Sequence, residues 1–297
     1  MHPHNLPRGA AYMLAAGLLF AVTAALIKLV SANLPNEMVV FFRNVIGLAA
    51  LAPWLLRRGP KYFATRHLGA HLVRALTGLA AMYCYFYAIA HLPLAEAVLL
   101  NYSAPLFIPL AALLWVGEPF SHRLWWPIGI GFIGIALILK PGLSLFTPVA
   151  LLGLAAGIFS ALAMAGIRRL AHTEPATRIV FYFSLTSTVV SALPLVWRWQ
   201  TPAAGLWLQL LLIGVLSTAA QILMTRAYTH APAAQVGPFS YGIVVFAGLL
   251  GWALWAEVPD ALSLGGALLV VVAGVLTIRI GGRETAPAPE LPDGTPR

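Results

Sequence analysis

Glu96, Arg43 and Arg74 are charged residues that lie inside long apolar stretches of this 297-residue chain, where a charge is expensive to keep. Glu96 could carry a coupling proton or bind a cationic group, or it could be a first-turn carboxylate that a helix dipole favours. Arg43 could bind a substrate carboxylate through two parallel hydrogen bonds. It could equally pair with Glu37 or extend to the edge of its apolar segment. For Arg43 and Arg74 the sequence favours a structural role, and it leaves Glu96 undecided.

Polar and aromatic residues within the same apolar stretches could line a cavity for a substrate. Tyr83 and Tyr87 are four residues apart and would share one helical face. Nearby prolines would free backbone carbonyl groups, which is tolerated where a cavity or a neighbouring helix satisfies them. Aromatic walls with a few neutral hydrogen-bonding groups suit an amino acid or a related zwitterion. The predicted cavity residues are Phe20, Thr23, Tyr83, Tyr87, Asn101, Tyr102, Ser103, Phe159, Ser160, Met164, Gln221, Ser240 and Tyr241.

The same polar residues have an alternative role, because Ser, Thr, Asn and Tyr side chains also join helices by hydrogen bonds. Glu118 and Glu257 each precede a proline-containing turn, so we expect them to cap or tether the ends of neighbouring helices. Gly129, Gly131 and Gly134 match the spacing of a dinucleotide fingerprint. They lie inside an apolar segment, where small residues favour close helix packing over nucleotide binding.

The sequence offers no pattern for metal, cofactor or catalytic chemistry. Cys84 is the single cysteine, so neither a disulfide nor a thiolate metal site can form within the chain. The His, Asp and Glu residues do not have metal-ligand spacing, and neither a nucleophile elbow nor a phosphate loop is present. We therefore expect neither cofactor nor metal, and we expect the protein not to be an enzyme. A membrane-embedded lipid enzyme is the disfavoured alternative from a different class.

The composition requires a membrane. Sixty per cent of the residues are hydrophobic and 9% are charged, whereas soluble domains have about 25% charged residues. A spanning helix needs about 20 apolar residues, and the chain has room for ten. We predict an all-α integral membrane protein. Its ten helices are expected near residues 10–30, 38–56, 69–90, 94–116, 124–140, 148–167, 178–197, 205–229, 233–256 and 262–280.

The basic residues predict the orientation. The chain has 18 Lys and Arg against nine Asp and Glu, and most of the basic residues fall in alternate loops. Cytoplasmic loops carry such an excess, so both termini are predicted to lie in the cytoplasm of a bacterial-type inner membrane. The same bias explains the positive charge without a nucleic-acid partner. Residues 1–8 would be a cytoplasmic segment and residues 281–297 a disordered cytoplasmic tail.

The chain also matches itself at a shift of 139 residues. His91, Pro93 and Ala95 align with a second His-x-Pro-x-Ala at residues 230–234, and Glu118 aligns with Glu257. The halves, residues 9–140 and 148–280, would hold five helices each. Since five is odd, the second half would enter the membrane in the opposite orientation. Inverted repeats of this kind are typical of secondary transporters that open a central site to alternate sides.

These segments resemble the drug/metabolite transporter superfamily, EamA type. The resemblance rests on Phe41-Phe42-Arg43-Asn44, His91-Leu-Pro-Leu-Ala-Glu-Ala97, Ser103-Ala-Pro105 and Gly117-Glu118. It implies ten helices, alternating access, and a central cavity lined by the first, third, fourth, sixth, eighth and ninth helices. The fifth and tenth would lie peripherally and suit a homodimer contact. We expect a secondary transporter, surrounded by lipid, that exports a small organic metabolite. The alternative is an uptake carrier for a larger cofactor-like or nucleoside-like solute.

Overall fold

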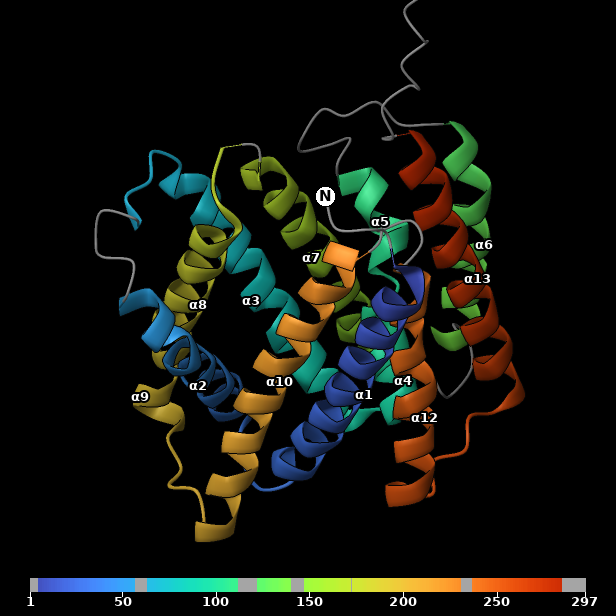
Figure 1. Cartoon of the computed structure of the whole chain (residues 1–297). Coiled ribbons are helices and arrows are strands. Elements are labelled where there is room, and N and C mark those ends of the chain that lie inside the picture. The colour runs from blue at the N-terminus through green and yellow to red at the C-terminus, as the bar shows by residue number, and fades with distance from the viewer. Residues whose placement is uncertain are drawn as a thin grey trace, which may run out of the picture.

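The computed structural model describes residues 5–56, 63–111, 122–139, 147–171, 173–230 and 237–284, which form a bundle of helices (Figure 1). Every regular element among them is helical, so the predicted all-α fold class is confirmed. The elements in chain order are α1 (Leu6–Ser31), α2 (Asn36–Leu56), α3 (Leu68–His91), α4 (Leu94–Asn101), α5 (Ala104–Ala111), η3 (His122–Leu124), α6 (Trp125–Leu139), α7 (Pro148–Ala171), α8 (Ala176–Ala192), α9 (Leu195–Arg198), α10 (Ala204–His230), η4 (Gly237–Tyr241), α12 (Gly242–Trp255) and α13 (Ala261–Glu284).

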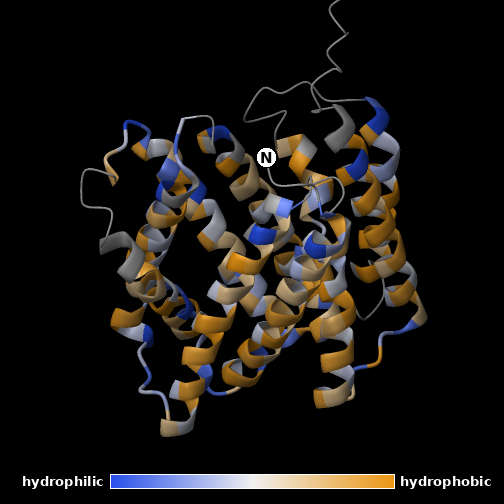
Figure 2. Cartoon of the chain, viewed as in Figure 1, coloured by the Kyte–Doolittle hydropathy of each residue, from blue (hydrophilic) through white to orange (hydrophobic). Residues whose placement is uncertain are grey.

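Five of these helices are long and apolar enough to cross a membrane, namely α1, α3, α7, α10 and α13. Shorter apolar helices lie at Leu94–Ile108, His122–Ile138, Arg178–Ala192 and Phe239–Trp255. Figure 2 shows hydrophobic residues along the length of the bundle, with most hydrophilic residues near helix ends and loops. The protein is therefore an integral membrane protein, and the count of ten spans stays a prediction.

The helix predicted at residues 94–116 is interrupted. Helix α4 ends at Asn101 and α5 begins at Ala104. Pro105 lacks an N–H and cannot donate to the carbonyl of Asn101, so the hydrogen-bond ladder must stop here. The break is closed by short-range bonds, from Ser103 N to Leu100 O at 3.3 Å and from Leu106 N to Ser103 O at 2.9 Å.

Two further boundaries differ from the prediction. The segment predicted at 178–197 ends as α8 at Ala192, and Pro194 separates it from the short α9. Helix α13 continues to Glu284, so residues 281–284 are helical rather than part of the predicted disordered tail. Residues 285–297 lie outside the described residues.

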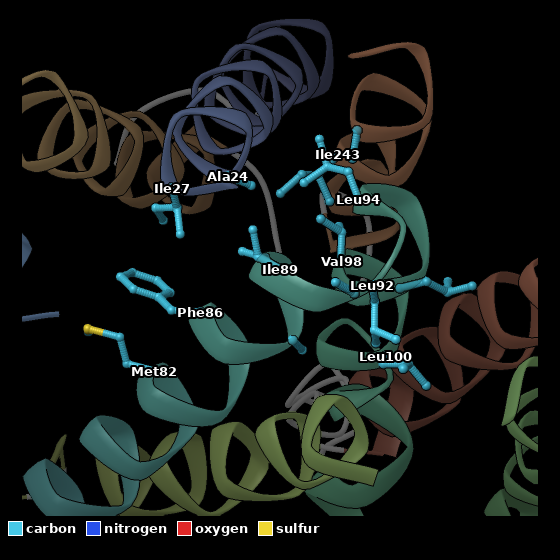
Figure 3. Packing of buried hydrophobic residues seen from close by; sticks show 14 of the residues in the cluster. Ala24, Ile27, Met82, Phe86, Ile89, Leu92, Leu94, Val98, Leu100 and Ile243 are labelled. Carbon is cyan, nitrogen blue, oxygen red and sulfur yellow. The ribbon is translucent and has the colours of Figure 1, made fainter. Parts of the chain in front are cut away.

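The centre of the bundle is made by α1, α3, α4 and α12, whose buried apolar side chains meet in Figure 3. Ile27 of α1, Ile89 of α3, Val98 of α4 and Ile243 of α12 are each almost completely buried. Around this centre, α1 packs along α10, and α3 packs along α7 and α8. Helix α2 contacts α8 and α10, and both α4 and α5 contact α7. Segments from the two halves of the chain are thus interleaved throughout.

Helices α6 and α13 pack against each other at one edge of the bundle (Figure 1). A Cβ on Gly134 would lie 2.8 Å from the carbonyl oxygen of Gly266, and a Cβ on Gly266 would lie 2.6 Å from that of Gly134. The two backbones therefore touch where both side chains are absent. Gly134 of the GxGxxG segment therefore serves close helix packing, whereas a Cβ on Gly129 would meet no heavy atom within 4 Å.

Two adjacent glycines of α13 provide a matched test of this contact. Gly266→Ala should lower the free energy of unfolding by about 1–3 kcal/mol, because its methyl group would overlap backbone atoms of α6. A Cβ on Gly265 would meet no heavy atom within 4 Å. Gly265→Ala should therefore leave stability unchanged or raise it slightly, since alanine favours a helix. Thermal unfolding in detergent measures both, and equal melting temperatures would rule out the α6–α13 contact.

Candidate functional site

The break between α4 and α5 brings three of the predicted cavity residues together. The hydroxyl of Ser160, on α7, donates a hydrogen bond of 3.1 Å to Oδ1 of Asn101. The hydroxyl of Ser103 donates to Leu100 O at 2.6 Å and so satisfies a carbonyl at the break. Gly157 of α7 lies against both, because a Cβ there would be 2.7 Å from Ser103 Oγ and 2.8 Å from Leu100 O. A glycine thus lets α7 approach an irregular backbone that carries polar groups.

Three tyrosines surround this break. The phenol groups of Tyr85 on α3 and Tyr241 on η4 both lie near enough to Tyr102 to interact with it electrostatically. Tyr241 is 3% exposed, and its hydroxyl has no hydrogen-bond partner among the described residues. Its ring extends to α13, where a side chain on Gly274 would overlap the hydroxyl. The structure therefore places Tyr102 and Tyr241 at one site, together with a residue that the sequence did not indicate.

The i,i+4 spacing of tyrosines on this helix favours Tyr83 and Tyr87 and does not point to Tyr85. The sequence signal for Tyr85 is the pair of small residues near it. Ala81 and Ala88 lie four residues before and three residues after Tyr85, on the same helical face, and both are buried. A tyrosine flanked by buried alanines on one face points into the bundle.

The remaining predicted cavity residues lie in different environments. Thr23 is buried, and its hydroxyl donates to Leu19 O at 2.7 Å within its own helix. The Tyr83 hydroxyl is buried without a hydrogen-bond partner among the described residues. Tyr87 is 37% exposed and stacks on His91 at 4.2 Å between ring centroids. The others are partly buried or exposed, and the assignment of all of these residues to a cavity stays a prediction: Phe20, Phe159, Met164, Gln221 and Ser240.

Glu257 joins three parts of the bundle at the end where α1, α3 and α12 finish. Its carboxylate pairs with Lys28 Nζ of α1 at 2.5 Å and accepts the N–H of Leu94 at 2.7 Å. Lys28 also donates to Leu92 O at 2.6 Å. Ala256 makes this possible, because its left-handed backbone (φ 54°) ends α12 and turns the chain back. The second predicted helix-end residue, Glu118, lies outside the described residues.

Glu96 lies close to this junction, in the first turn of α4. Its Oε1 accepts a hydrogen bond of 2.7 Å from the hydroxyl of Ser263 on α13. The carboxylate therefore has both a favourable helix position and a neutral partner. A coupling role for Glu96 stays a prediction.

At the opposite end of the bundle, Glu174 connects the loops that precede α3 and α8. Its carboxylate accepts hydrogen bonds from Thr65 Oγ1 and from Arg178 Nη1, both at 2.5 Å. Burial by itself would raise the pKa of Glu174, but these bonds and the nearby positive charge outweigh it and hold the pKa below its usual value. This tether between the halves was not indicated by the sequence.

Arg43 and Arg74 have no carboxylate partner among the described residues. Arg43 Nη1 donates to Asn44 Oδ1 at 3.1 Å. Glu37, an alternative partner of Arg43 in the sequence prediction, instead faces Arg198 at 3.8 Å. The guanidinium of Arg74 lies 3.8 Å from the ring centre of Phe183 on α8.

Comparison with known proteins places this arrangement among transporters. The model of the EamA-like transporter family matches the chain twice, at residues 7–140 and 147–279. The pseudopaline exporter CntI of Pseudomonas aeruginosa is 38% identical over 277 residues, which cover 92% of this chain and 97% of that protein.

More distant similarities extend over the same length. A riboflavin transporter of Vibrio cholerae is 30% identical over 92% of this chain and 94% of that protein. An S-adenosylmethionine uptake transporter of Rickettsia bellii is 24% identical over 84% of this chain and 86% of that protein. A solved crystal structure has a similar fold, with a TM-score of 0.62 at 21% identity over 94% of this chain.

Proposed function

Because this chain belongs to the EamA-like transporter family of the drug/metabolite transporter superfamily, we propose that it is a secondary transporter that exports a small organic metabolite by alternating access. The substrate would be an amino acid or a related zwitterion, and the membrane a bacterial inner membrane. The observation that carries the proposal is the double family match, which covers nearly the whole chain.

The packing of the helices supports two equivalent halves. Shifting each element to its counterpart exchanges α1 with α7, α3 with α10, and α12 with the α4–α5 segment. Helix α1 packs against α10, and the corresponding helices α7 and α3 also pack against each other. Helix α1 contacts α12, and its counterpart α7 contacts α4 and α5. The α6–α13 contact maps onto itself. Five helices in each half would make the repeats inverted, which is the arrangement that alternating access exploits.

The proposed direction and orientation rest on separate observations. Export is favoured because the exporter of Pseudomonas aeruginosa has 38% identity. The riboflavin and S-adenosylmethionine transporters support the alternative, an uptake carrier for a larger cofactor-like solute. The basic loops would place both termini in the cytoplasm. A homodimer through the outer faces of α6 and α13 remains a further proposal.

Transport by purified protein in liposomes tests the function. Vesicles loaded with an unlabelled amino acid should accumulate the same labelled compound by exchange, for at least one member of a panel of amino acids and related zwitterions. Protein-free liposomes are the control. Exchange of riboflavin or S-adenosylmethionine, with no exchange of amino acids, would favour the uptake alternative. If the reconstituted protein exchanges no member of the panel and neither cofactor, the proposal is wrong.

A further inference from the structure

We propose that Arg43 and Arg74 form a paired guanidinium site for a carboxylate group of the transported substrate, so that the substrate is a small carboxylate-bearing organic molecule. This inference rests on the proposed transport function and specifies the substrate class of the same protein. It starts from two positive charges that the described residues leave without a negative partner.

Neither arginine lies at a helix end. Arg43 is more than one turn inside α2, and Arg74 is more than one turn inside α3. Nε and Nη1 of Arg74 are buried and have no hydrogen-bond acceptor among the described residues. A side chain that only extended to the membrane surface would keep its guanidinium in contact with water or lipid headgroups. Two of the three guanidinium nitrogens of Arg74 are thus shielded from solvent and have no acceptor among the described residues.

The carboxylates that the structure describes are engaged elsewhere. Glu37 faces Arg198, and Glu257 pairs with Lys28. Glu96 accepts from Ser263, and Glu174 accepts from Arg178. Asp260 caps the backbone N–H of Ser263 at 2.8 Å. Within the described part of the chain, each of these acids is thus held by a group other than Arg43 or Arg74.

Helices α2 and α3, which carry the two arginines, contact each other and both contact α8, and the positive charge of Arg43 acts on Arg74. Burial of one unpaired charge is costly, and a second like charge nearby adds repulsion. An anion bound between them would offset both costs. A bound carboxylate can accept two parallel hydrogen bonds from a guanidinium, which makes arginine the preferred side chain for this ligand.

The surroundings of the pair supply further donors. Nδ2 of Asn44, whose Oδ1 accepts from Arg43, is buried and has no acceptor among the described residues. On α8, the Ser187 hydroxyl is buried without a partner among those residues, and it lies one helical turn from the Phe183 ring that contacts Arg74. A ligand that only accepts hydrogen bonds would satisfy these groups. The Phe183 ring would contact its apolar part.

Matched ligands that differ by one group test the proposal. Alanine and alaninamide, leucine and leucinamide, and succinate and succinamide are each added to the purified protein, so that the amide member of each pair carries no carboxylate, and the melting temperature is measured. A ligand that binds the folded state raises it. We expect at least one carboxylate member to raise it far more than its amide. Arg43→Gln and Arg74→Gln should weaken that carboxylate's affinity about tenfold to a hundredfold, the range for a lost charged hydrogen bond.

Stability without ligand separates binding from a structural role. If the arginines are held for a ligand, Arg43→Gln and Arg74→Gln should leave the ligand-free melting temperature unchanged or raise it, because like-charge repulsion is removed. Arg198→Gln is the control and should alter neither carboxylate affinity nor stability, since its side chain is 62% exposed. If Glu118 neutralises Arg43 or Arg74, Glu118→Gln and the Gln variant of that arginine will both lower the melting temperature measured without ligand. That result would overturn the proposal.

Three other outcomes also contradict the proposal. The first is an equal rise in the melting temperature with the carboxylate and the amide of every pair, or no rise with either. The second is carboxylate preference that persists in the Arg43→Gln/Arg74→Gln double variant. The third is stabilisation by phosphatidylglycerol alone, which would assign the pair to a lipid headgroup. Exchange in liposomes of a solute without a carboxylate, unaffected in both variants, would refute this site while leaving the transport function intact. Carboxylate binding without exchange of any solute would refute the transport function instead.

Discussion

Glu257→Gln should lower the free energy of unfolding by about 2 kcal/mol, because it leaves the ammonium group of Lys28 without its carboxylate. The two side chains are only 12% and 19% exposed, so water cannot fully replace the lost partner. The junction also holds the start of α4 through the N–H of Leu94. Thermal and chemical unfolding in detergent would measure the loss.

Glu37→Gln is the matched control for this prediction. Its carboxylate is 3.8 Å from Arg198, whose side chain is 62% exposed, so its removal should cost about 0–1 kcal/mol. The double variant Lys28→Met/Glu257→Gln should regain part of the lost free energy of unfolding, because it removes the unpaired ammonium group of Lys28 together with the carboxylate. If Glu257→Gln costs no more than Glu37→Gln, the ion pair does not join α1 to α12.

Gly157→Leu should abolish transport and destabilise the protein by about 3 kcal/mol, because its side chain would occupy the space of the Leu100 carbonyl and the Ser103 hydroxyl. Those groups form the break between α4 and α5, beside Asn101 and Tyr102. Gly157→Ala should give a smaller effect in the same direction. Exchange activity in liposomes and the melting temperature would measure the two consequences separately.

Gly129→Leu controls for the change of glycine to leucine within a helix. Gly129 is exposed, and a Cβ there meets no heavy atom within 4 Å. This variant should keep both stability and exchange. Normal exchange by Gly157→Leu at normal stability would show that the α4–α5 break takes no part in transport.

The helices themselves were largely predictable. In lipid, the backbone must satisfy its own hydrogen bonds, so a long apolar run must be helical. Helix α3, for example, was expected at 69–90 and extends from Leu68 to His91. The breaks at Pro105 and Pro194 were harder to predict, because a proline can either kink a helix or end it. Which of these happens depends on whether neighbouring groups satisfy the freed carbonyls, as Ser103 does at Leu100.

The candidate site was predictable only in part. Residue type and segment predict Asn101, Ser103 and Ser160, and the structure brings them together at one break. Residue type and segment do not distinguish Tyr85, although it lies near Tyr102. Spacing identifies residues that share a helical face, but the face that turns inward depends on the neighbouring helices.

The sequence alone determined the membrane class, the helical fold, the internal repeat and the family, because these depend on composition, on local backbone chemistry and on matching segments. Only the tertiary structure decided which charges meet, as for Lys28 and Glu257, which are 229 residues apart. The physical reason is the solvent. A helix in lipid is apolar on its outer face as well as its inner one, so hydrophobic periodicity does not fix its rotation. Packing against other helices sets that rotation, and with it contacts such as that of Arg74 with Phe183.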